Sequence, residues 1–168
     1  MTAPESQERF QTLVDGHKKI LYKVCNSYCR SRDDREDLAQ EIIVQMWQSF
    51  DSFDKRYQFS TWMYRIALNV AISFYRRENT RSRHILSDEL HMLKAVDEAA
   101  NQNPEMLGLY ELIERLEPLN KALVLLYLDG NSHLEIADVL GISVTNVATK
   151  IGRLKESMKQ EYRGATRA

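Results

Sequence analysis

Apolar residues recur at spacings of three and four along most of this chain, which is the period of one face of an α-helix. The pattern predicts one helix from Phe10 to Tyr28 and a second helix on which Leu38, Ile42, Met46 and Phe50 repeat the period after an acidic first turn. With six Gly and three Pro among 168 residues, the composition also suits helices better than a loop-rich sheet protein. The sequence therefore predicts an all-α fold.

The segment between these two helices carries the signals of a helix start. SRDD (31–34) interrupts the apolar period and supplies a capping residue for the second helix. Glu36 and Asp37 are expected in its first turn, where negative charge suits the helix dipole.

Residues 51–60 show neither the helical nor the strand period, so they are expected to form a loop that ends in an N-cap at Ser60 or Thr61. The next helix should run to about Arg77. At 100° per residue it has two faces. One face is apolar and should pack; it carries Met63, Ile66, Ala67, Val70 and Phe74. The other face is polar and could read a ligand; it carries Trp62, Arg65, Asn69, Ser73 and Arg76.

The polar stretch that follows is the best candidate for a linker, because it is weakly periodic and ends in Asn-Pro. The predicted organisation is two small helical domains, 1–80 and 107–168, joined by a flexible linker over 81–106. In the second domain, Pro118 should open a very apolar helix that stops at Asp129-Gly130.

The strongest local signature lies between residues 132 and 158. Ser132 and Glu135 fit a capping box, a short helix turns at Gly141, and a longer helix restarts after Ser143. This order predicts a helix-turn-helix whose second helix buries Val147, Ile151, Leu154 and Met158. Its exposed early residues are polar or basic, which suits bases and phosphates; they are Thr145, Asn146, Thr149, Lys150 and Arg153. An ordinary antiparallel helix pair is the alternative.

Aromatic and cationic side chains gather in the loop and helix of the first domain. The aromatics are Phe53, Tyr57, Phe59 and Trp62, and the polar and basic neighbours are Arg56, Arg65, Asn69, Arg76 and Arg77. Such a mixture suits unstacked bases and their backbone. Some of these rings should belong to the core, because aromatic residues at helical spacing usually do.

Charge and motifs exclude other classes of function. The net charge of −1 hides basic stretches at 76–84 and 150–167, with an acidic stretch between them. The sequence has no P-loop, HExxH or GxSxG motif, and the four histidines are scattered, so no enzyme, metal or cofactor is expected. Cys25 and Cys29 should be buried apolar residues rather than zinc ligands. The absence of a signal segment or membrane span predicts a cytoplasmic protein without membrane insertion.

The run DREDLAQEIIVQMWQSFDSFDKRYQFSTWMYRIALNVAISFYRR (34–77) resembles the second region of bacterial sigma factors. The run ERLEPLNKALVLLYLDGNSHLEIADVLGISVTNVATKIGRLKESM (114–158) resembles their fourth region. The two runs together, with a short linker and no long insert, match the extracytoplasmic-function group.

This resemblance implies an RNA polymerase sigma factor that directs promoter-specific initiation, with core polymerase, promoter DNA and an anti-sigma factor as partners. It implies polymerase docking by Asp37, Gln40, Glu41 and Trp47. It implies capture and melting of the minus-ten element by residues 53–77, and reading of the minus-thirty-five element by the helix-turn-helix. The recognition helix is less basic than in many members around Ala148 and Lys150.

Two other functions remain as alternatives at this point. A stand-alone helix-turn-helix regulator would bind an operator by itself, whereas a sigma factor should bind DNA poorly until polymerase is added. A helical adaptor for protein partners would leave the aromatic and basic region at 53–77 without a role.

Overall fold

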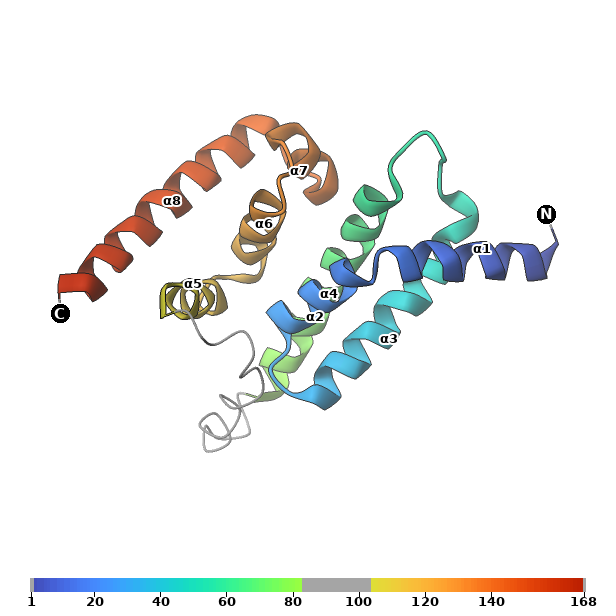
Figure 1. The fold of residues 1–168 in the computed structure, drawn as a ribbon, viewed down its shortest axis with the longest axis horizontal. Coiled ribbons are helices and arrows are strands. Elements are labelled where there is room, and N and C mark those ends of the chain that lie inside the picture. The colour runs from blue at the N-terminus through green and yellow to red at the C-terminus, as the bar shows by residue number, and fades with distance from the viewer. Residues whose placement is uncertain (1, 83–103, 168) are drawn as a thin grey trace. The chain divides into compact units, whose positions relative to one another are not determined.

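The computed structural model describes residues 2–82 and 104–167, and every regular element in these ranges is helical (Figure 1). The chain divides into two compact units, Met1–Ser82 and Arg83–Ala168, called here the N-terminal and C-terminal units. Each unit has its own buried core. The predicted all-α class is confirmed.

The N-terminal unit contains four α-helices and one short 3-10 helix. They are α1 (Ala3–Gly16), α2 (Lys18–Tyr28), α3 (Arg32–Ser49), η1 (Phe50–Ser52) and α4 (Phe59–Ser82). Helices α2, α3 and α4 pack against one another, as Figure 1 shows. The fully buried side chains at their centre include Val24, Leu38, Ile42, Met46, Met63 and Leu68. Burial of these apolar residues is the main stabilising contribution to the unit.

The single helix predicted from Phe10 to Tyr28 is wrong, because the chain breaks between α1 and α2 at His17. Gly16, a poor helix former, ends α1, and His17 leaves the helical region with φ −124° and ψ 20°. The His17 Nδ1–H donates to the carbonyl of Leu13 at 2.8 Å, and the ring packs 5.0 Å from that of Phe59 on α4. A tertiary contact therefore accompanies the break.

The cap predicted within SRDD is confirmed, since the Ser31 hydroxyl accepts from the backbone N–H of Asp34 at 3.1 Å. The acidic residues of the first turn are Asp33 and Asp34, however, rather than Glu36 and Asp37. Helix α3 starts at Arg32, so the expected pair falls in its second turn.

Helix α4 begins at Phe59 and not after Ser60 or Thr61, and it ends at Ser82 and not near Arg77. The Gln58 carbonyl accepts the first helical hydrogen bond, from the N–H of Trp62 at 3.2 Å. Phe59 is buried, so packing of its ring places the start of α4 one or two residues before the position that the local capping signals predict.

The C-terminal unit contains α5 (Pro104–Glu114), α6 (Pro118–Leu128), α7 (His133–Leu140) and α8 (Val144–Arg167). Pro118 is the first residue of α6, and residues 122–126 of this helix are all buried, as its apolar sequence predicts. Lys121 is buried with them, which the sequence did not predict. The predicted linker overlaps the end of α4 and the start of α5, and its remainder, 83–103, lies outside the described residues.

Helices α7 and α8 form the predicted helix-turn-helix. Ser132 accepts from the N–H of Glu135 at 3.2 Å, and the Glu135 carboxylate accepts from the N–H of Ser132 at 2.7 Å, which completes the capping box. Gly141 ends α7 with φ +68°, a left-handed conformation that glycine adopts without a steric penalty. Val147 and Ile151 are buried as predicted, whereas Leu154 and Met158 are only half-buried.

Candidate nucleic-acid and polymerase interfaces

The start of α8 presents the side chains that the sequence assigned to DNA. Ser143 precedes the helix, and its hydroxyl accepts from the N–H of Asn146 at 3.1 Å. Exposed side chains follow on the side of the helix away from buried Val147 and Ile151; they are Thr145, Asn146, Thr149 and Arg153, with Lys150 half-buried. Because a helix N-terminus carries partial positive charge, this end suits phosphate oxygens as well as base edges.

The four aromatic residues near the start of α4 differ in exposure. Tyr57 is 62% exposed, Phe53 and Trp62 are half-buried, and Phe59 is only 7% exposed. The rings of Phe53 and Trp62 lie 5.1 Å apart, and Phe59 is 5.6 Å and 5.3 Å from them. Phe59 is therefore a core residue that supports Phe53 and Trp62, while Tyr57 is open to a ligand.

A compact turn holds Tyr57 at the surface. The Asp54 carboxylate accepts from the backbone N–H of Arg56 at 3.0 Å and pairs with its guanidinium at 2.6 Å. The Tyr57 N–H donates to the carbonyl of Asp54 at 3.0 Å. The hydrogen bonds from Arg56 lower the pKa of the Asp54 carboxyl, which keeps it ionised. Sequence reasoning gave Asp54 no role, although Asp is a common turn residue because its carboxylate can accept from the backbone N–H two residues on.

The polar face predicted on α4 is present. Arg65, Asn69 and Arg76 are all exposed, and they follow half-buried Trp62 along the helix. Arg77 has a different environment, because its guanidinium pairs with the Glu41 carboxylate on α3 and lies 5.7 Å from the ring centre of Phe74. The structure thus joins Arg77, assigned to DNA, to Glu41, assigned to polymerase docking.

The residues assigned to polymerase docking lie on α3. Asp37, Gln40 and Glu41 are exposed, and Val44, at the same helical spacing, is 53% exposed. Sequence reasoning missed Val44, since an apolar residue in an amphipathic helix is normally assigned to the core. Trp47 is 43% exposed and contacts Phe10 of α1, with 5.1 Å between ring centres.

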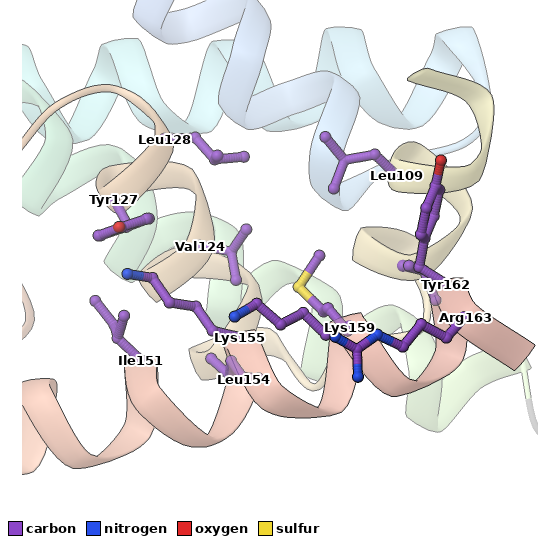
Figure 2. A pocket seen from close by; sticks show the side chains of 12 residues that line it. Leu109, Val124, Tyr127, Leu128, Ile151, Leu154, Lys155, Lys159, Tyr162 and Arg163 are labelled. Carbon is purple, nitrogen blue, oxygen red and sulfur yellow. The ribbon is translucent and has the colours of Figure 1, made fainter. Parts of the chain in front are cut away.

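An apolar groove of about 650 Å³ runs between α5, α6 and α8 of the C-terminal unit (Figure 2). Its apolar side chains include Leu109, Leu112, Val124, Leu128, Leu154 and Met158, and Lys155, Lys159 and Arg163 of α8 add positive charge. The Lys155 ammonium lies 4.4 Å from the ring centre of Tyr127, a cation–π distance. The half-buried Leu154 and Met158 are thus explained: they line a groove rather than a closed core.

Cys25 and Cys29 are both buried, as predicted, and neither is in a disulfide. Burial raises the pKa of the Cys25 thiol to about 11 and that of the Cys29 thiol to about 12. Across the ranges 2–82 and 104–167, no cluster of three or more His, Cys, Asp or Glu residues could hold a metal ion. None of the helices in these ranges is long and apolar enough to cross a membrane.

Two family models match the chain in separate regions. Residues 13–81 match the model for Sigma-70 region 2, and residues 106–158 match the model for Sigma-70, region 4. The two matches fall on the N-terminal and C-terminal units, respectively. Together they exclude the alternative of a stand-alone regulator, which region 4 alone would have left open.

Individual proteins give the same result over nearly the whole chain. ECF RNA polymerase sigma factor SigW of Bacillus subtilis is 29% identical, covering 94% of this chain and 90% of SigW. The ECF RNA polymerase sigma-E factor of Escherichia coli K12 is 29% identical, covering 90% and 85%. CnrH, solved in complex with the cytosolic domain of CnrY, superposes with a TM-score of 0.67 at 25% identity, covering 94% and 90%.

A second solved structure supports the fold. RpoE, from a complex with the anti-sigma factor NepR of Bartonella quintana, superposes with a TM-score of 0.66 at 17% identity. It covers 94% of this chain and 96% of that one. The chain matches sigma region 2 and then region 4, it is similar to extracytoplasmic-function sigma factors along most of its length, and it shares their fold. This chain therefore belongs to the extracytoplasmic-function family of RNA polymerase sigma factors.

Proposed function

We propose that the two units of this sigma factor divide promoter recognition between them. The C-terminal unit reads the upstream element with the exposed start of α8, and the N-terminal unit docks on core polymerase and captures the opened downstream element. The observation that carries this proposal is that each unit has its own core and its own exposed polar surface with side chains suited to nucleic acid.

At the upstream element, α8 would lie in the major groove. Thr145, Asn146 and Thr149 would contact base edges, because hydroxyl and amide groups can donate and accept there. Lys150 and Arg153 would contact phosphates and set the helix in register. This assignment follows from the exposure of Thr145, Asn146, Thr149 and Arg153 on one side of a capped helix, with Lys150 half-buried next to them.

At the downstream element, the loop and α4 would hold an unstacked base. Unstacking a base costs a few kcal/mol, and stacking it on an aromatic ring returns roughly 1–3 kcal/mol. Tyr57 has the exposed ring, and Phe53 of the same loop and Trp62 of α4 are partly exposed. Asn69 lies on the polar face of α4 with Arg65 and Arg76, where its amide can meet a base edge while the arginines meet the backbone.

Docking would use α3. The exposed Asp37, Gln40 and Glu41 provide carboxylates and an amide for a basic polymerase surface, and exposed Val44 adds apolar area at the centre of the same face. Trp47 would contribute the part of its ring that Phe10 does not cover. A net charge of −1 gives the chain little DNA affinity alone, which is consistent with a core polymerase that would supply most of the phosphate contacts.

We also propose that the chain performs no chemistry of its own, acts in the cytoplasm where polymerase works, and is held inactive by an anti-sigma factor. The relative CnrH was solved with the cytosolic domain of CnrY. In this chain, the groove of the C-terminal unit offers apolar side chains beside Lys155, Lys159 and Arg163. An amphipathic helix with acidic flanks fits that combination.

Transcription with core polymerase on a library of randomised promoters tests the proposal. We expect specific transcripts only when both the chain and core polymerase are present, and two separated sequence elements should emerge among the active promoters. Transcripts whose selection shows a single element would contradict the division of labour. Specific binding of the isolated chain that matches the holoenzyme would contradict the role assigned to polymerase.

A further inference from the structure

Phe50 lies at the centre of the aromatic cluster in the N-terminal unit. Its ring centre is 5.2 Å from that of Phe10, 6.3 Å from Trp47, 6.2 Å from Trp62 and 6.4 Å from Phe53. These four rings come from α1, α3, α4 and the loop. Phe50 itself begins η1, the short turn that connects the docking helix α3 to the loop.

The contacts of Phe50 fall into two groups. Phe10 and Trp47 lie toward the proposed docking side, and Phe53 and Trp62 belong to the proposed base-capture site. The Arg9 guanidinium also lies 5.6 Å from the ring centre of Phe50, a cation–π distance. Phe50 is only 7% exposed, so its own ring is not available to a base.

We propose that Phe50 is a positioning residue, which fixes Phe53 and Trp62 for base capture and anchors them to the docking helix. This inference rests on the proposed downstream site. Phe53 and Trp62 are half-buried, so each ring packs against the protein over part of its surface and is exposed over the rest. For Trp62 and Phe53, part of the protein side is the ring of Phe50. Removing that ring would leave both side chains able to rotate, and a misplaced stacking surface captures a base less well.

The chemistry of the ring matters here as well as its volume. Edge-to-face and offset-stacked geometries give directional contacts between aromatic rings, which aliphatic side chains cannot reproduce. The Phe50–Trp62 planes meet at 62° and the Phe50–Phe53 planes at 14°, which are an edge-to-face and a stacked arrangement. Leucine would fill much of the space, but it would not restore these orientations.

Phe74 offers a matched control. It is also 7% exposed and lies in the same unit, but it comes 12 residues after Trp62 on α4, about 18 Å along the helix axis. The Phe74→Leu change removes the same ring from an equally buried position. Arg77, which lies over Phe74, keeps its ion pair with Glu41.

The experiment compares holoenzymes carrying Phe50→Leu, Phe50→Tyr and Phe74→Leu. For each we would measure affinity for core polymerase, promoter occupancy, thymine reactivity to permanganate and base preference in both promoter elements. Phe50→Leu should leave promoter occupancy and upstream preference unchanged, and it should lower core affinity at most slightly, because Trp47 keeps its contact with Phe10 at 5.1 Å between ring centres. It should lower thymine reactivity about tenfold, as the weakening of one or two ring contacts would, and flatten the downstream preference.

Phe50→Tyr keeps the ring and should retain most of the opening, whereas Phe74→Leu should lower thermal stability comparably to Phe50→Leu without changing downstream preference. Equal promoter opening by the Phe50→Leu and Phe74→Leu holoenzymes, measured as thymine reactivity, would overturn the proposal and make Phe50 an ordinary core residue. Tyr57→Ala and Asn69→Ala holoenzymes distinguish a failure of the underlying site. If both show full thymine reactivity, the downstream site itself is misassigned, whatever Phe50 does.

Discussion

Arg76 and Arg77 are neighbours in the chain, yet their side chains have different surroundings. Arg76 is exposed, whereas Arg77 pairs with Glu41 of α3 and lies over Phe74. An exposed ion pair contributes at most about 1 kcal/mol to stability. It does, however, offset the charge that Arg77 would otherwise present to a phosphate.

These surroundings predict unequal effects on DNA binding. Arg76→Gln should weaken holoenzyme binding to all promoters alike and reduce the slope of log affinity against log salt by about 1, the value for one lost phosphate contact. Arg77→Gln should change that slope much less. Binding titrations at several salt concentrations measure both. Equal slope changes would mean that Arg77 leaves Glu41 when DNA binds.

Cys25 and Cys29 lead to a prediction about pH. In an unfolded chain the pKa of each thiol is 9.0. In the fold, burial disfavours the thiolate and raises the pKa to about 11 for Cys25 and to about 12 for Cys29. Their contribution to stability is therefore complete below about pH 9 and is lost as the pH rises toward 11 or 12. Denaturant unfolding of the wild type and of a Cys25→Ala, Cys29→Ala chain should show a steeper alkaline loss in the wild type. Parallel curves would contradict these raised pKa values.

At the level of elements, α8 combines base-reading and phosphate-binding positions on one surface. Asn146 lies in the first turn, whose cap is the Ser143 hydroxyl, and Arg153 lies two turns further on. Because an amide can make two hydrogen bonds to one base, Asn146 should sense sequence. Arg153, whose guanidinium would contact phosphate, should not sense sequence.

Two substitutions separate these roles. Asn146→Ala should change which upstream sequence is preferred, at a cost of about 1–3 kcal/mol on the best site. Arg153→Ala should weaken every sequence by a similar factor and flatten the salt dependence. Selection from a library of upstream sequences gives the preferred sequence, and binding titrations on the selected sequences give the loss of affinity and its salt dependence. The assigned roles are wrong if both variants lose affinity uniformly.

At the scale of the whole molecule, the chain has two cores rather than one. Met46 and Leu123 are both fully buried, the first in the N-terminal unit and the second in the C-terminal unit. Changing either side chain to Ala should cost about 2–5 kcal/mol. Since distant sites without shared partners act independently, each loss should stay within its own unit.

Amide hydrogen exchange of the full chain checks this independence. Met46→Ala should speed exchange in α2, α3 and α4 and leave α6, α7 and α8 unchanged, and Leu123→Ala should do the reverse. Faster exchange in both units from either substitution would show that the units unfold together. In that case the division between downstream and upstream recognition would have to operate within one cooperative structure.

Local chemistry explains what the sequence alone predicted correctly. Ser132, Glu135 and Gly141 act within a few residues of their own positions, through hydrogen bonds and a backbone conformation that depend little on the rest of the fold. The period of the apolar residues likewise placed Met63, Ala67 and Phe74 of α4 and Val147 and Ile151 of α8 in the core. On α4 it was wrong in part, because Ile66 and Val70 are only half-buried and Leu68 and Ala71 are buried instead. The family resemblance added what these signals could not supply, which is the order of the two regions and their common function.

Tertiary structure decided the features that depend on partners distant in sequence. The ring of His17 lies against that of Phe59. Because Phe59 is buried, α4 starts before Ser60 and Thr61, the expected capping residues. Arg77 meets Glu41 across 36 positions of sequence. The groove of the C-terminal unit exists because three helices meet there. In each case the energy comes from a contact that forms only after the helices pack, so periodicity and capping signals could not reveal it.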